Sequence, residues 1–306
     1  MSAQPMIVGA GLAGLLAAHA WPRAQVLEAR PRPEAIHKAV LRFRSRAASV
    51  LTGIEFREVL VRKGIWSEGA AVAPSIRCAN LYAQKVLGRL TGDRSIWNTE
   101  PATRYIAPPD FYEQMVGVVG SRIAWGEVVD FTLGKGPLVS TAPLPVTLAA
   151  VGYEAANQMN FHHADIHVER LRVKGADLFQ TIYFPDAATG VYRASFTGDL
   201  LIAEGSRAIT PQDLQQNVFP AFGLLPGWGN VEAVGPPSRQ SYGKIAPLED
   251  APRKAAMYHL TVRHNVFSLG RFATWRNILL DDVVDDIAVI KRLMRADGYS
   301  LRKEAS

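Results

Sequence analysis

The first thirty residues show a regular alternation of apolar runs and small residues. An apolar run, Pro5–Val8, leads into three glycines and an Ala/Leu-rich stretch that ends at Ala20. A second apolar run follows and ends on Glu28. This order is typical of a strand, a helix packed closely on it, and a second strand.

The middle of the chain has a different pattern. Four segments rich in β-branched and aromatic residues are separated by turn residues, which predicts a meander of antiparallel strands. They are Ile166–Val173, Phe179–Phe184, Val191–Thr197 and Leu200–Glu204. Helices are expected over residues 111–119 and 211–219. Shorter strands are expected near residues 122–124, 127–131, 137–143, 242–245, 257–262 and 266–269, whereas residues 31–100 predict no definite elements.

The C-terminal pattern is helical again. Apolar residues recur at i, i+4, i+7 and i+11 on one face of a helix expected from about 281 to 295, with an aspartate at its start as cap. These are Val283, Ile287, Ile290 and Met294. The sequence therefore predicts an α/β fold in which a β-rich section interrupts a Rossmann-like domain. We expect that domain to comprise residues 1–150 and 262–306, and the β-rich substrate domain to comprise 151–261 with part of 40–100.

The three N-terminal glycines each have a place in binding a dinucleotide. Gly9 permits a tight turn, Gly11 lets the backbone approach a pyrophosphate, and Gly14 lets the helix pack closely on the strand. The helix N-terminus then offers free N–H groups and a positive dipole end to the phosphates. A purely structural glycine turn is the alternative, but the strand before and the helix after favour a dinucleotide site.

Glu28 stands nineteen residues after Gly9, near the position that accepts ribose hydroxyls. An acid there favours an unphosphorylated ribose over NADP. A second glycine fingerprint is missing from the sequence, so a reductase with two nucleotide domains is not expected.

Composition and charge narrow the class of protein further. With 48% apolar and 20% charged residues, the chain is typical of globular proteins, and no apolar run approaches the ~20 residues that span a bilayer. The first strand begins too early for a signal peptide, and Cys78 is the single cysteine, so we expect a cytoplasmic protein. The net charge of +6, concentrated between Arg30 and Lys63, leaves an acidic or nucleic-acid partner open beside an ordinary small-molecule enzyme.

Three local matches resemble one group of flavoproteins, which contains amine oxidases, protoporphyrinogen oxidase and UDP-galactopyranose mutase. The first match is the glycine fingerprint with Glu28. The second is Val139–Pro143, which looks like a strand re-entering the FAD domain. The third, Gly270–Val284, is similar to a mutase-like ending in which Gly-Arg approaches the flavin and the next helix points its N-terminus at the ring. An ordinary strand-to-helix turn is the alternative for Gly270–Trp275.

The resemblance implies that the dinucleotide is FAD. The residues expected to hold it are Gly9, Gly11, Leu12, Ala13, Gly14, Glu28, Ala29, Arg30, Val129, Thr141, Ala142, Gly270, Arg271, Asp282 and Val283. The residues expected to serve the reaction are Arg271, Lys244, Tyr242 and Arg193, with Tyr183, Thr274 and Trp275 as neighbours. By the same resemblance, Lys244 would act at flavin N5 through water. The guanidinium group of Arg193 is suited to hold a carboxylate or phosphate with two hydrogen bonds.

This chain departs from the group at two points. Glu28 is followed by Ala-Arg-Pro-Arg-Pro without the usual Gly-Gly pair, and His37 stands alone where the mutases have a histidine- and glycine-rich signature. The leading hypothesis is an amine-oxidase-like FAD enzyme that transfers a hydride from a C–N carbon of an amine or amino acid. The alternatives are a sugar-nucleotide isomerase, an enzyme acting on an amino-acid-modified base in DNA, as compact phage flavoproteins do, and a non-catalytic FAD-binding protein.

A histidine-rich strand offers a candidate metal site. His163, Asp165 and His167 share one face at period two, but no fourth ligand is in view. We therefore expect an exposed polar strand face and no metal.

Overall fold

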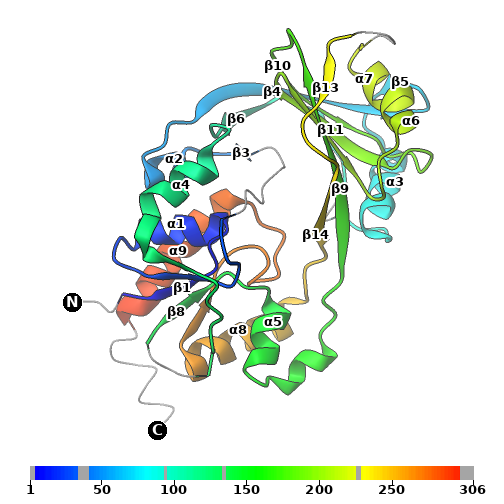
Figure 1. The fold of residues 1–306 in the computed structure, drawn as a ribbon. Helices are drawn as coiled ribbons and strands as arrows, with labels where there is room; N and C mark the ends of the chain where they lie inside the picture. The colour runs from blue at the N-terminus through cyan, green and yellow to red at the C-terminus, as the bar shows by residue number, and fades with distance from the viewer. Residues whose placement is uncertain (1–3, 34–40, 93–94, 133–135, 225–228, 297–306) are drawn as a thin grey trace.

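A computed structural model describes residues 4–33, 41–92, 95–132, 136–224 and 229–296. Within these ranges the strands form two sheets, a parallel one near both termini and a larger mixed one at the other end of the molecule (Figure 1). The candidate site lies where the two parts meet.

The first sheet has five parallel strands in the order β15-β8-β1-β2-β7. Their bounds are β1 Met6–Val8, β2 Val26–Glu28, β7 Ile123–Trp125, β8 Leu138–Ser140 and β15 Val266–Ser268. In this order β1 lies between β2 and β8. β2 follows β1 in the chain after helix α1 (Leu12–Ala20), whereas β8 comes much later in the chain. A parallel sheet needs helices on both faces because both faces are apolar.

Two apolar clusters provide that cover. On one face α1, α4 (Phe111–Val119) and α9 (Leu280–Ala296) pack together with α2 (Ala47–Thr52). On the other face α5 (Leu144–Ala150) and α8 (Asp250–His264) pack around Leu144, Leu148 and Leu260, which are fully buried. The sheet therefore lies between two helical layers and holds the carboxyl ends of its strands in fixed positions.

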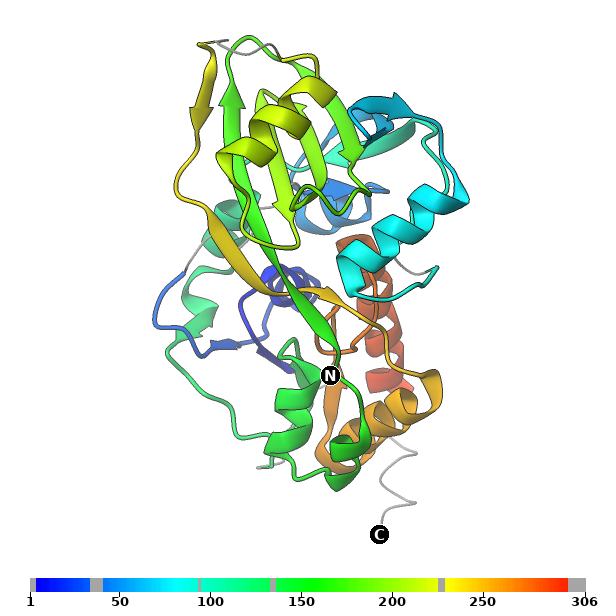
Figure 2. The same cartoon turned by 90° about the vertical axis from the view of Figure 1, so that its right-hand side faces the viewer.

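The second sheet has ten strands in the described residues and is mixed. Its main order is β13-β9-β12-β11-β10-β4-β6-β3, with β14 paired to β9 and β5 to β4. The bounds are β3 Arg42–Phe43, β4 Arg57–Ser67, β5 Ala70–Val72, β6 Ala102–Ile106, β9 His163–Val173, β10 Leu178–Tyr183, β11 Val191–Gly198, β12 Leu200–Gly205, β13 Val231–Ala233 and β14 Ser238–Ile245. Strands β9 and β14 extend from this sheet toward α5 and α8 of the first part (Figures 1 and 2).

Helices cover one face of the second sheet. The helical segment formed by α6 (Pro211–Asp213), a π turn (Leu214–Val218) and α7 (Phe219–Ala221) lies on its outer face, where Phe196 and Val218 are fully buried (Figure 2). Helix α3 (Ile76–Leu87) packs against Ile65, Val168 and Ile202 of the second sheet, and Ser75 caps it by accepting the N–H of Cys78.

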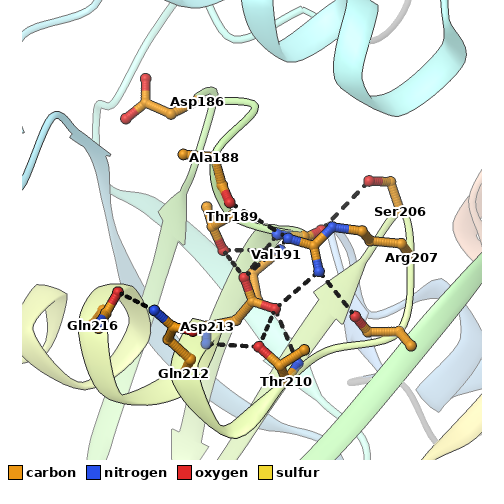
Figure 3. Close-up of polar contacts among 12 residues, drawn as sticks. Asp186, Ala188, Thr189, Val191, Ser206, Arg207, Thr210, Gln212, Asp213 and Gln216 are labelled. Atoms are coloured by element: carbon orange, nitrogen blue, oxygen red, sulfur yellow. Dashed lines mark hydrogen bonds and ion pairs between the residues drawn. The ribbon is translucent and has the colours of Figure 1, made fainter.

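The buried carboxylate of Asp213 fixes α6 to the sheet (Figure 3). It accepts the N–H of Gly190 at 2.9 Å and the N–H of Thr210 at 2.9 Å, and it pairs with Arg207 at 3.2 Å. Burial opposes ionisation, but the donors around the carboxylate outweigh it and hold the pKa of Asp213 well below its usual range. The charge is thus part of the framework rather than of a site open to ligands.

Most elements expected from the sequence are present. The α1 and α4 helices, the meander β10-β11-β12 with β9 beside it, and the C-terminal helix are confirmed. The strand expected over 257–262 is wrong, because these residues belong to α8, which has Asp250 in its first turn and Asn265 in the left-handed conformation as its C-cap. The strand expected over 127–131 is also wrong, since Glu127–Asp130 has no regular structure. The domain limits at residues 150 and 262 stay a prediction.

No helix in the described ranges is both long and apolar enough to cross a lipid bilayer.

Candidate functional site

A cavity of about 630 Å³ lies at the carboxyl ends of β1, β2 and β8. This edge of an open parallel sheet is where α/β proteins bind ligands, and the volume is in the usual range for ligand pockets. Most residues expected to contact the dinucleotide line it: Gly9, Gly11, Leu12, Ala13, Glu28, Ala29, Arg30, Val129, Thr141, Ala142, Arg271 and Val283. The other three expected residues, Gly14, Gly270 and Asp282, are not among the lining residues.

The glycine turn after β1 is shaped by close contacts. Gly9 has φ +99°, and a Cβ on it would lie 2.3 Å from Oγ1 of Thr141. A Cβ on Gly14 would lie 1.8 Å from the carbonyl oxygen of Gly9. Both positions therefore require glycine for the turn and for the packing of α1 on β1.

Gly11 differs from these two glycines. An added Cβ would meet nothing within 4 Å, because the residue faces the cavity. Gly11 is also the N-cap of α1 and provides no side chain to accept the first N–H groups of the helix. Free N–H groups and the positive end of the helix dipole thus adjoin the cavity, an arrangement that binds anions such as phosphates.

The carboxylate of Glu28 lies at the far side of this turn. It accepts the N–H of Ala10 at 2.7 Å, and the N–H and guanidinium of Arg30 at 2.9–3.0 Å. Burial alone would raise the pKa of Glu28, but the hydrogen bonds from Arg30 and Ala10 outweigh it and lower the pKa. The group is therefore ionised at neutral pH, and its four acceptor positions are taken by Arg30 and Ala10. A ribose hydroxyl would bind there in place of one of the Arg30 donors.

The C-terminal segment closes the opposite wall. Gly270 has φ +91°, and a Cβ on it would lie 3.0 Å from that of Ala13. Arg271 lines the cavity and donates to the carbonyl oxygen of Gly243 in β14 at 3.2 Å. Asp281 lines the cavity, whereas Asp282 pairs with Arg44 at 2.8 Å and accepts the N–H of Leu279.

Arg193, Lys244 and Tyr242, which are expected to serve the reaction, lie on strands β11 and β14 of the second sheet. Arg193, which is partly exposed, forms an ion pair with buried Glu204, and the Nζ of Lys244 lies 4.6 Å from the centre of the Tyr192 ring. Burial would raise the pKa of Glu204, but the charges of Arg193 and Lys244 outweigh it and lower the pKa. These groups therefore carry a fixed arrangement of charge close to the strand bulge of β14.

Tyr242 lies at that bulge. It has φ +57°, uncommon for a residue with a side chain, and its ring lies 4.3 Å from that of His163 and 5.8 Å from that of Trp275. The next residue, Gly243, is the one that binds Arg271. The structure thus brings Tyr242 beside Arg271, and backbone strain of this kind is concentrated at functional sites.

Arg42 and Tyr112 are among the cavity residues that were not foreseen from the sequence. Arg42 lines the cavity, and its guanidinium donates to Oγ1 of Thr181 at 2.7 Å and to Oγ1 of Thr197 at 2.8 Å. Tyr112, on α4, also lines the cavity and donates to the carbonyl oxygen of Ala10. In the sequence, Arg42 is only one member of a basic stretch, and Tyr112 is only one member of an apolar helix face. Neither pattern indicates where the side chain points.

The histidine strand forms part of β9. The ring of His163 packs on Tyr242, and Asp165 pairs with Arg239. In the described ranges no group of three or more His, Cys, Asp or Glu side chains is placed to hold a metal ion.

Comparison with known proteins identifies the fold. No family model matches the chain, and no curated protein sequence matches it. The chain is similar in structure to reduced UDP-galactopyranose mutase, with TM-score 0.67, 14% identity, and coverage of 95% of this chain and 96% of that one. It is also similar to a fatty acid isomerase from P. acnes that produces CLA (TM-score 0.60, 14% identity, 94% and 98% coverage) and to an oxidoreductase from Methanosarcina mazei (TM-score 0.56, 10% identity, 94% and 99% coverage).

The chain has the fold of Rossmann-type flavoproteins. The expected fold class, a Rossmann-like part joined to a β-rich part, is confirmed. The resemblance to amine oxidases in particular, and a nucleic-acid partner, have no support in these comparisons and stay predictions.

Proposed function

We propose that the chain is an FAD-dependent oxidoreductase whose cofactor lies in the cavity described above. The observation that carries the proposal is the open approach at Gly11, where the uncapped start of α1 faces the cavity and a Cβ would project into empty space. The fold shared with flavoproteins supports the same assignment.

The residues present fit FAD along the whole cavity. The first N–H groups of α1, at Leu12 and Ala13, would bind the pyrophosphate, and the carboxylate of Glu28 would accept the ribose hydroxyls. Arg271 and Val283 would lie toward the flavin. When bound, FAD supplies the hydride acceptor, flavin N5, and the protein supplies binding, orientation and electrostatics.

The finer part of the proposal concerns the substrate, a molecule with an oxidisable carbon that bears nitrogen. Arg42 lines the cavity, Arg193 acts electrostatically on Arg42, and Arg193 and Lys244 both act on Glu204, the carboxylate that opposes these charges. A protonated amine would be repelled by this field. The site therefore favours the neutral amine, the form from which a hydride leaves most readily, while Tyr242 and Arg271 hold the wall between cavity and sheet.

Anaerobic reduction tests this proposal directly. The FAD-loaded chain is mixed with a panel of amines and amino acids in the absence of oxygen, and bleaching of the flavin band is followed together with formation of the imine-derived carbonyl product. Arg271→Gln should slow the bleaching while Arg292→Gln, at an exposed position on α9, should not. A panel in which no amine bleaches the bound flavin would contradict amine oxidation.

A flavin-dependent isomerase is the second candidate. It is favoured by two of the structural relatives, a mutase and an isomerase, each matched over more than nine tenths of both chains. An isomerase of this class would need the flavin reduced beforehand and would release an isomer without consuming oxygen. An oxidase would consume oxygen and release an oxidised product, so product analysis separates the two.

A further inference from the structure

One face of the second sheet carries a row of cationic and hydroxyl side chains. Residues in direct register on neighbouring strands have their side chains on the same face. Lys63, Thr181 and Ser195 are in register across β4, β10 and β11, and the next row includes Tyr183, Arg193 and Glu204. The same two rows also contain Ile202 and Ile65, which pack with α3, and the opposite face carries the apolar residues that α6 and α7 cover.

Two further arginines join this face. The guanidinium of Arg42 reaches Thr181 and Thr197 from β3. Arg104 is in register with Val59 of β4, on the same side as Lys63. The positive charges are close enough to interact: after burial, the charge of Arg193 helps to lower the pKa of Arg42 to about 10, and the charge of Arg104 helps to lower that of Lys63.

The anionic groups near these cations are few. Glu204 is the partner of Arg193 and also feels the charge of Lys244. Glu100 acts on Lys63 only at a distance. Among the described residues, neither Lys63 nor Arg104 forms an ion pair with a carboxylate within 4 Å. A half-buried surface with excess positive charge attracts anions strongly.

This face adjoins the cavity, because Arg42 belongs to both. An aromatic ring lies in the same row as Arg193, because Tyr183 is in register with it; the ring packs 5.5 Å from that of buried Tyr82. Guanidinium and ammonium groups beside a partly buried aromatic ring suit a small molecule with an anionic end and an apolar body.

We propose that the face formed by Arg42, Lys63, Arg104, Thr181 and Arg193 binds the anionic group, a carboxylate or a phosphate, of the substrate. The inference rests on the proposed function, because it places the substrate of that reaction. It assigns recognition to side chains on the sheet and leaves the flavin cavity to the cofactor.

Calorimetric titration of the FAD-loaded chain at low salt tests this. Benzoate and phenyl phosphate are the two anionic probes and phenol is the neutral one. We expect one or both anions to bind and phenol not to bind. The anion that binds more tightly shows whether the face prefers a carboxylate or a phosphate. In Lys63→Gln/Arg104→Gln the dissociation constant should rise by about tenfold or more, the usual effect of removing hydrogen bonds to a charged group.

Arg62→Gln is the matched control. Arg62 neighbours Lys63 on β4, points to the other face and is exposed, so its loss should change the constant less than about twofold. Equal loss in both variants, unchanged binding in the double variant, or equal binding of phenol would overturn the inference. Melting followed by circular dichroism confirms that the variants are folded.

The titration is repeated with the chain freed of cofactor. A chain that takes up no FAD contradicts the proposed function, while the unloaded titration still decides whether the cationic face binds anions. A chain that holds FAD and binds neither anion contradicts this inference alone.

Discussion

The substitution Gly11→Ala adds a single methyl group and tests cofactor binding separately from folding. Gly11 has φ −73° and ψ 176°, values open to any residue, and a Cβ there meets no protein atom within 4 Å. The folded chain should therefore accept alanine with a loss of no more than about 1 kcal/mol, the cost of a poorer N-cap.

Gly11→Ala should weaken the binding of FAD more than it destabilises the folded chain. The added methyl would stand in the cavity at the start of α1, where the backbone must approach the pyrophosphate. An extra methyl group in a closely packed contact costs about 1–3 kcal/mol, which corresponds to a rise of about 5- to 150-fold in the dissociation constant. The assay is titration of cofactor-free protein with FAD, followed by quenching of flavin fluorescence.

Gly117→Ala and Gly14→Ala complete the test. A Cβ at Gly117, exposed on α4, also meets nothing within 4 Å, so this variant should bind FAD as the wild type does. A Cβ at Gly14 would strike the Gly9 carbonyl oxygen at 1.8 Å, so this variant should lose stability as well as FAD. If Gly11→Ala and Gly117→Ala bind FAD equally well, the placement of the cofactor is refuted.

Three other predictions concern charged groups. Glu28→Gln should lower the free energy of unfolding by about 1.5–3 kcal/mol, because Arg30 and two N–H groups bind the charged form, and should weaken FAD; urea unfolding and FAD titration measure both effects. The pKa of Glu28 is lowered from 4.5. Its contribution to stability should therefore be complete above pH 4.5 and should be lost as the pH falls through the pKa of the folded protein. Urea midpoints of wild type and Glu28→Gln, measured between neutral and acid pH, should converge in acid. Asp213→Asn should cost about 1.5–3 kcal/mol, because the buried charged carboxylate accepts hydrogen bonds from Thr189, Gly190 and Thr210. Asp199→Asn, in a surface pair with Arg172, should cost less than about 1 kcal/mol; similar losses in guanidinium unfolding would contradict the role given to Asp213.

The elements that could be predicted from the sequence are those with strong local signals. The close packing of α1 on β1 depends on the contact of Gly14 with Gly9 within the first βαβ unit, and α9 shows its buried face as an apolar repeat that ends near Met294. The strand order of the meander follows from short turns between successive strands. These features depend on residues that are near one another in the chain.

The elements that were missed depend on distant contacts or mixed signals. In β4, Val59 and Val61 are buried, but exposed Leu60 between them hides the alternation. In α8, the β-branched pair Thr261 and Val262 favoured a strand, although the helix caps decide the structure. The partners of Arg42 lie about 140–155 residues away, so no local pattern indicates that it reaches the second sheet.

The measurement that tests the central claim most directly is the visible spectrum of the purified protein, followed by chromatography of any nucleotide released on denaturation. The account predicts a flavin spectrum and the release of FAD on denaturation. If the cofactor was lost during purification, added FAD should bind and restore the spectrum. A colourless protein that also fails to bind added FAD would contradict it.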